Sequence, residues 1–284
     1  MQLTAEVERA IRSVKPLPQV AQRVLQVVQE PDFAIDRLVD VVRTEPTLVA
    51  RVLRLCNSAR HGLGVQITSL TAAVAYVGTR NLVQLVLVSC SAEWFQGVRS
   101  SAYTSPLELW QHSLTCALLC QELAERLPGV DRATAFTAGI LHDIGKVALA
   151  QVDVDAALLR DAARDVDPRS AERRAFGLDH AAAAGLVGAA WQLPATLIAT
   201  LRDHHDPEVV LGDDPLPALL HLADRMALRG ADEPPLGASP SELDRAALAQ
   251  LDLDLDTLTL ARARAIEELT KASELLNLAA QHVR

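Results

Sequence analysis

Helical periodicity runs through nearly all of this 284-residue chain, and it restricts the fold more than any other feature. Apolar residues recur every three or four positions in segments such as QVAQRVLQVVQ, IDRLVDVVR and TLIATLRDHH. This spacing is typical of helices that bury one face. The sequence shows no sustained alternation of apolar and polar residues bounded by hairpin turns, which would indicate strands. We therefore predict an all-α fold with no significant sheet.

The composition agrees with close-packed helices. Hydrophobic residues make up 50% of the chain but aromatic residues only 3%, so Ala, Leu and Val must fill the core. The four cysteines lie in apolar helical surroundings and are predicted to be buried free thiols: Cys56, Cys90, Cys116 and Cys120. Free thiols are typical of a reducing cytoplasm. We expect a cytoplasmic protein without membrane insertion, because the N-terminus has no apolar signal core and the apolar runs are too short to span a bilayer.

Interruptions of the helical pattern predict three parts. Residues 1–100 are expected to form one helical lobe, 101–230 a second lobe, and 231–284 a linker followed by C-terminal helices. GVRSSAYTSP (97–106) and ADEPPLGASPS (231–241) have the composition of connecting segments. Ser69 and Gly78 are predicted to cap a helix, and Ser239 with Glu242 has the spacing of a capping box. ATAFTAGILHDIGKVALA is predicted to be one helix that Gly145 loosens.

An ordered series of histidines and aspartates in the second part is the strongest chemical signal. It consists of His112, His142, Asp143, His180, His204, His205 and Asp224. Imidazole nitrogens and carboxylate oxygens together bind Zn, Fe, Mn and similar ions. We expect Asp143 to bridge two ions, with His112, His142 and Asp224 around the first and His180, His204 and His205 around the second. Lys146, one turn beyond the His-Asp pair, could contact a phosphate.

Three further residues allow two interpretations each. Glu108 precedes His112 by four positions and could share its metal, but Ser105-Pro106-Leu107-Glu108 is also a capping-box pattern. Glu172 either approaches the site from the segment before His180 or is solvated. His221 lies one turn before Asp224, so its helix face would suit the site, but we interpret it as a packing residue.

The net charge of −9 disfavours non-specific binding to nucleic acid or to an anionic membrane, since both require a basic excess. Arg51, Arg54 and Arg60 could form a local basic patch, but we interpret them by default as part of a solvated helix face. Nucleic acid is therefore not an expected partner.

The series His112, His142-Asp143 and Asp224 resembles the HD superfamily of metal-dependent phosphohydrolases. The segments LPQVAQRVLQVV, TEPTLVARVLRLCNSA and ITSLTAAVAYVGTRNLVQLVL are similar to the HDOD family, the HD-related output domain of bacterial signalling proteins. In the second part GILHDIGK, ERRAFGLDHAAAAGLV and WQLPATLIATLRDHHDP follow in the order of that family. The resemblance covers about residues 10–230.

The resemblance implies a two-lobed helical HDOD fold whose second lobe, 101–230, is the HD-like one. It implies a bacterial signal-transduction protein that acts as a regulatory or scaffolding output module. The expected cofactor is one or two divalent ions, Fe, Mn or Zn. The expected partner is a signalling protein or a small nucleotide ligand, and a homo-oligomer is compatible with this role.

The alternative is a metal-dependent phosphohydrolase or phosphodiesterase that acts on a nucleotide or cyclic dinucleotide, with Asp143 and Lys146 as catalytic residues. The ligand series also resembles that of HD-GYP cyclic di-GMP phosphodiesterases. However, DPEVVLGDDPL after His205 lacks the Asp-Gly-x-Gly-Tyr-Pro segment of those enzymes. If the chain is an enzyme, it is not a typical HD-GYP phosphodiesterase.

Overall fold

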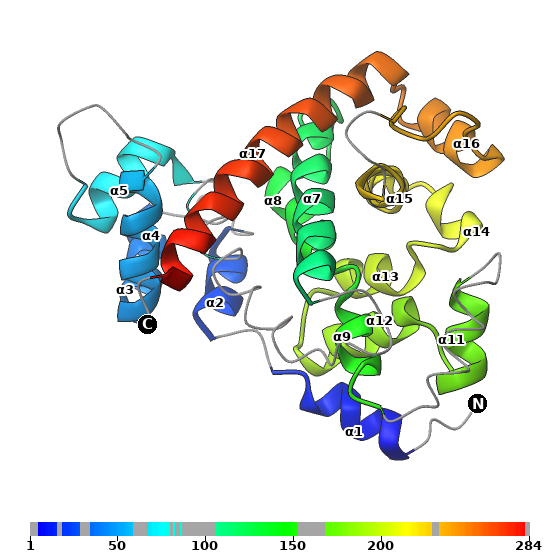
Figure 1. The fold of residues 1–284 in the computed structure, drawn as a ribbon, viewed down its shortest axis with the longest axis horizontal. Coiled ribbons are helices and arrows are strands. Elements are labelled where there is room, and N and C mark those ends of the chain that lie inside the picture. Colours follow the sequence, from blue (N-terminus) through cyan, green and yellow to red (C-terminus); the bar gives the residue numbers. More distant parts are fainter. Residues whose placement is uncertain are drawn as a thin grey trace. The chain divides into compact units, whose positions relative to one another are not determined.

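The computed structural model describes residues 5–15, 19–28, 35–58, 67–79, 82, 86, 106–152, 168–228 and 233–281 (Figure 1). Every regular element in these ranges is a helix and none is a strand, which confirms the predicted fold class. The chain divides into two compact units. The larger unit comprises Met1–Pro16 and Trp94–Ile266, and the smaller unit comprises Leu17–Glu93 and Glu267–Arg284. The three-part division expected from the sequence stays a prediction.

The smaller unit is built around α3 (Ile35–Arg43), which packs against α2 (Gln19–Val28), α4 (Pro46–Ser58) and α5 (Leu70–Val77). The Ser69 side chain accepts a hydrogen bond from the backbone N–H of Ala72 at 3.1 Å, and Gly78 ends α5 with a φ of 81°. Both predicted caps are therefore confirmed. Arg60 and the side chains of Arg51 and Arg54 lie outside the described residues.

The larger unit surrounds α7 (Pro106–Ala124), which is buried on most sides and packs against α8 (Arg132–Leu141) and α15 (Pro215–Ala227). A second group of helices comprises α9 (Ile144–Leu149), α12 (His180–Ala190) and α13 (Ala195–Asp203), with α12 against both others (Figure 1). α1 (Ala5–Ser13) packs on α9 and α12. The remaining helices are α11 (Pro168–Phe176), α14 (Pro207–Val210), α16 (Glu242–Gln250) and α17 (Leu255–Gln281), whose residues from Glu267 group with the smaller unit.

The predicted continuous helix through the His-Asp pair is wrong, because the chain turns at the pair itself. α8 ends at Leu141 and α9 begins at Ile144. Asp143 has φ −95° and ψ 9°, outside the helical range, and its carbonyl accepts from the Lys146 N–H at 2.9 Å to start the next turn. The break places both side chains at the junction of two helices.

Gly145 is needed for a close helix contact rather than for the turn. A Cβ atom at this position would lie 1.9 Å from the carbonyl oxygen of His180 and 2.7 Å from the Ala184 nitrogen. Gly139 has the same function between α8 and α7, since its Cβ would lie 2.4 Å from the Ala117 Cα. These two glycines allow the backbones that carry the candidate ligands to approach one another.

The C-terminal capping box lies two residues later than predicted. Ser241, not Ser239, is the N-cap of α16, and Asp244, not Glu242, is its N3 partner. The Asp244 carboxylate accepts from the Ser241 N–H at 2.8 Å, and Ser241 Oγ accepts from the Asp244 N–H at 3.0 Å.

Three of the predicted free thiols are confirmed as buried and unbridged, Cys56, Cys116 and Cys120, while Cys90 lies outside the described residues. None of the helices in the described ranges is both long enough and apolar enough to cross a membrane.

Replacing Gly145 with Ala should destabilise the larger unit by about 1–3 kcal/mol, the usual cost of overpacking, because the new methyl group would overlap the backbone of α12. Urea unfolding measures this change. Gly188→Ala on α12 is the matched control: its Cβ would meet only side-chain carbons, at 3.4 Å or more, and alanine favours the helix by up to about 1 kcal/mol. Equal stability of both variants would contradict this packing.

Candidate metal centre

Seven potential ligands from separate helices converge in the larger unit. His112 comes from α7, His142 and Asp143 from the turn before α9, and Asp224 from α15. His180 begins α12, and His204 and His205 follow the end of α13. The structure gathers two sets: the first group is His112, His142 and Asp143, and the second group is His180, His204 and His205, each with ligand atoms within 4.8 Å of one another. These residues could hold a metal ion.

The first group, with Asp224, has the spacing of ligands around one ion. His112 Nε2 lies 3.2 Å from His142 Nε2, 3.4 Å from Asp143 Oδ2 and 3.1 Å from Asp224 Oδ1. His142 Nε2 lies 3.4 Å from Asp143 Oδ2 and 3.6 Å from Asp224 Oδ1. Ligand bonds of about 2.1 Å give ligand-to-ligand distances of about 3.0 Å in an octahedron and about 3.4 Å in a tetrahedron. These four side chains therefore fit a divalent ion.

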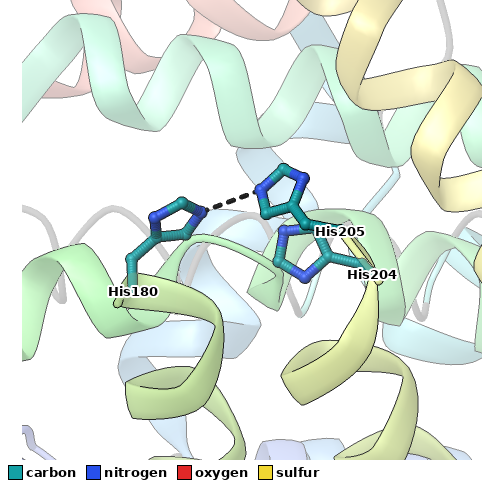
Figure 2. Close-up of side chains that lie close together, drawn as sticks. All are labelled: His180, His204 and His205. Carbon is teal, nitrogen blue, oxygen red and sulfur yellow. Dashed lines mark hydrogen bonds between the residues drawn. The ribbon is translucent and has the colours of Figure 1, made fainter. Parts of the chain in front are cut away.

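The second group lies at the start of α12 and at the end of α13, and Figure 2 shows the three rings close together at these neighbouring helix ends. His180 Nε2 lies 3.0 Å from His205 Nε2, and the rings of His204 and His205 have centroids 4.0 Å apart. His204 is fully buried, and its Nε2 atom makes no hydrogen bond within the described part of the chain. A buried ring nitrogen without such a bond is costly, and a metal ion would satisfy it.

Asp143 connects the two groups. Its Oδ2 atom faces His112 and His142, whereas its Oδ1 atom lies 3.5 Å from His180 Nε2. The carboxylate is 1% exposed, and Oδ1 has no hydrogen bond to any other described residue. A carboxylate directed at two sets of imidazoles is the arrangement that a bridge between two metal ions requires.

Backbone and carboxylate acceptors set the orientation of three histidines. His142 Nδ1 lies 2.8 Å from the Gly139 carbonyl, and His204 Nδ1 lies 2.8 Å from the Leu201 carbonyl. A carbonyl oxygen only accepts, so each Nδ1 must carry the proton and each Nε2 is directed at the site. His180 is oriented by Glu172, whose Oε2 accepts from both Nδ1 and the backbone N–H of His180 at 2.7 Å. Such partners fix the tautomer of a metal ligand.

The buried charges influence one another strongly. Burial alone would lower the pKa of His142, but the carboxylates of Asp143 and Asp224 outweigh burial and raise this pKa to about 10. Burial would raise the pKa of Asp143, but His142 and Lys146 keep this pKa well below its usual range. By contrast, burial and the neighbouring His180 lower the pKa of His205 to about 3. At neutral pH the metal-free first group thus carries a protonated His142, while His205 is neutral.

Lys146 lies beside the bridging carboxylate. Its Nζ donates to Asp143 Oδ2 at 2.7 Å, and its side chain is 23% exposed. His112 is 13% exposed at its side chain, so the site has a solvent-facing side at His112 and Lys146. Lys146 therefore combines a contact to the ligand set with access to solvent.

All seven predicted ligands and Lys146 are brought together, and their role as ligands stays a prediction. Glu108 is exposed on the first turn of α7 and belongs to neither group. Ser105 lies outside the described residues, so the alternative capping box is not described. Glu172, one of the ambiguous residues, is buried and approaches the site through His180. Its place in the segment that precedes His180 was the available signal in the sequence.

Replacing Glu172 with Gln should weaken metal binding at the second group by about 10–100-fold, because the ring of His180 loses its charged acceptor. Binding at the first group should change less. Calorimetric titration of metal-free protein with Zn²⁺ measures both affinities. Glu8→Gln, on the exposed face of α1, is the control for a lost surface charge. Unchanged affinity in Glu172→Gln would contradict an orienting role.

Metal binding at the first group should release about one proton per chain at pH 7, because a ligand must be deprotonated and the pKa of His142 is about 10 in the metal-free protein. His205 should release none, since it is already neutral. Affinity should therefore rise with pH between about 6 and 9. Titration calorimetry in buffers of different ionisation enthalpy counts the protons. A heat that is independent of the buffer would be inconsistent with this protonation state.

Comparison with known proteins supports the fold and the family. A crystal structure from Shewanella amazonensis SB2B, provisionally named a phosphohydrolase, has a TM-score of 0.73 at 25% identity, over 96% of this chain and 98% of that one. An HDOD domain protein of unknown function from Geobacter sulfurreducens has a TM-score of 0.72 at 23% identity, over 95% of this chain and 97% of its own.

Among curated proteins, an uncharacterised protein of Treponema pallidum (strain Nichols) is 25% identical over 208 residues. That match covers 72% of this chain but 40% of the length of the relative. The HDOD domain family itself matches residues 14–207, more than half of the sequence. This match, together with the helical fold and the ordered ligand series, shows that the chain belongs to the HDOD domain family.

Proposed function

We propose that this protein is a regulatory module of signal transduction whose larger unit binds two divalent metal ions. The observation that carries the proposal is the position of Asp143, whose two carboxylate oxygens face different sets of histidines. One ion would be held by His112, His142, Asp143 and Asp224. The other would be held by Asp143, His180, His204 and His205. The mixed nitrogen and oxygen donors suit Fe, Mn or Zn.

The regulatory role is supported by family membership and by the segment that follows the paired histidines. Asp206 caps α14 by accepting from the Glu208 N–H at 3.0 Å, and the chain then continues into α15. This segment has no counterpart of the Gly-Tyr-Pro motif of cyclic di-GMP phosphodiesterases. A related fold from Marinobacter aquaeolei VT8, 21% identical with a TM-score of 0.70, is provisionally named a signal transduction protein. The proposed partner is a signalling protein or a small nucleotide.

Hydrolysis of a phosphate ester is the second candidate, and the position of Lys146 favours it. The ammonium group lies 2.7 Å from Asp143 Oδ2 while part of the side chain faces solvent. It could neutralise a phosphate oxygen beside the ligand set. Bound metal ions would supply Lewis-acid activation of water and phosphate. The relative from Shewanella amazonensis that is provisionally named a phosphohydrolase agrees with this candidate.

Metal content per chain tests the proposal. Protein purified anaerobically, without a metal-affinity column, should contain two equivalents of Fe, Mn or Zn by mass spectrometry. Asp143→Asn should lose both, because the bridge contributes to both positions, whereas Asp224→Asn should lose one. Asp213→Asn, an exposed change between α14 and α15, should lose none. Folded wild-type protein that binds no metal after reconstitution would overturn the proposal.

The same samples separate the two candidate functions. Metal-loaded wild-type protein is assayed against phosphomonoesters, linear phosphodiesters and cyclic dinucleotides. Activity at background supports the regulatory role. Turnover that Asp143→Asn and Lys146→Gln abolish, while Lys146→Gln retains its metal, would establish the hydrolase instead.

A further inference from the structure

A second buried polar cluster lies next to the metal centre, between α15 and α16. His221 Nε2 lies 2.9 Å from Asp244 Oδ1, and Arg225 Nε donates to the same oxygen at 3.3 Å. The other oxygen of Asp244 accepts from the Ser241 N–H at 2.8 Å. Asp244 is fully buried and His221 is 7% exposed. An ionised carboxylate is retained in such a position only when its hydrogen bonds are satisfied, as they are here.

The two residues of α15 that hold Asp244 flank Asp224 in the sequence. His221 lies three positions before Asp224 and Arg225 one position after it. They are four residues apart, so both contacts lie on one side of the helix and span about 6 Å of its axis. Two polar contacts at this separation restrict both rotation and sliding of α15. The apolar contacts of α15 with α7 and α8 are less directional.

We propose that Asp244 is a positioning residue of the metal centre: through His221 and Arg225 it holds α15 so that the Asp224 carboxylate faces His112 and His142. This inference rests on the proposed metal binding. It makes α16, which lies beyond the residues 14–207 matched by the family, a functional part of the site. The first metal position is the one that Asp224 shares with His112 and His142, and the second is the one around His180, His204 and His205. Because Asp224 is a proposed ligand of the first position alone, metal affinity at the second position serves as an internal reference.

The test compares Asp244→Asn with Ser241→Ala. The asparagine keeps the shape of the side chain but removes its charge, whereas Ser241→Ala removes the helix cap and leaves the contact between His221 and Asp244 in place. In calorimetric titration with Zn²⁺, Asp244→Asn should lower the affinity of the first position about tenfold, the lower end of the range for groups that orient metal ligands. The second position should keep its affinity, and Ser241→Ala should change neither. Equal loss at both positions, or no loss at either, would overturn the inference.

A second measurement keeps the inference distinct from the proposed function. In metal-free protein with labelled histidines, the NMR signals of the His112 ring should shift in Asp244→Asn, because His112 Nε2 lies 3.1 Å from Asp224 Oδ1. The rings of the second group should shift less, since Asp224 contacts His112 and His142 and not these rings directly, and Ser241→Ala should affect neither group. An unmoved His112 signal would refute the positioning role whether or not the wild-type protein binds metal.

A milder pair of variants covers the case in which Asp244→Asn does not fold. His221→Ala removes one of the two contacts that α15 makes with Asp244, and it should also weaken metal binding at the first position. His221→Gln supplies an amide that can donate to Asp244, and it should recover part of the affinity. If His221→Gln binds Zn²⁺ at the first position no more tightly than His221→Ala does, the positioning role is refuted and the cluster only stabilises the fold.

Discussion

The carboxylate of Asp143 is the group on which the arrangement of the larger unit depends. It is 1% exposed and has imidazoles of both groups and the Lys146 ammonium within 3.5 Å. A buried charge costs several kcal/mol unless opposite charges and hydrogen bonds compensate it. The helices around Asp143 must therefore bring their polar side chains to one place. Gly145 permits this, because any side chain there would separate α9 from the start of α12 and thus Asp143 from His180.

A layer of partners behind the ligands makes this arrangement specific. Carbonyl oxygens of Gly139 and Leu201 and the carboxylate of Glu172 each hold one Nδ1 atom, so the corresponding Nε2 atoms point inward. Only Glu172 among them uses a side chain, and its carboxylate also accepts from the first N–H of α12. A helix start and a ligand orientation therefore depend on one residue. Orientation of this kind reduces the reorganisation that metal binding requires.

The fold class and the candidate ligands that the structure brings together could be predicted from the sequence, because helical periodicity and ligand type are local properties. The contacts that depend on neighbouring helices could not. The sequence predicted one continuous helix loosened at Gly145, whereas the chain turns at His142-Asp143 and Gly145 instead allows a close helix contact. The spacing Ser-x-x-Glu at 239–242 and Ser-x-x-Asp at 241–244 fits a capping box equally well. The contact of Asp244 with His221, 23 residues away, favours the later start.

In the proposed regulatory role, metal binding would act through stability and not through turnover. The proposed ligands come from positions 112 to 224, so metal ions would bind the folded larger unit and have little affinity for the separated segments. Ligand binding of this kind stabilises the folded state by about 2.7 kcal/mol when the free ion is at 100 times its dissociation constant. The stability of α9, α12 and α15 in their folded arrangement would then depend on the concentration of free metal ion. Since α1 packs on α9 and α12, such a change would reach the helix that precedes the smaller unit in the chain.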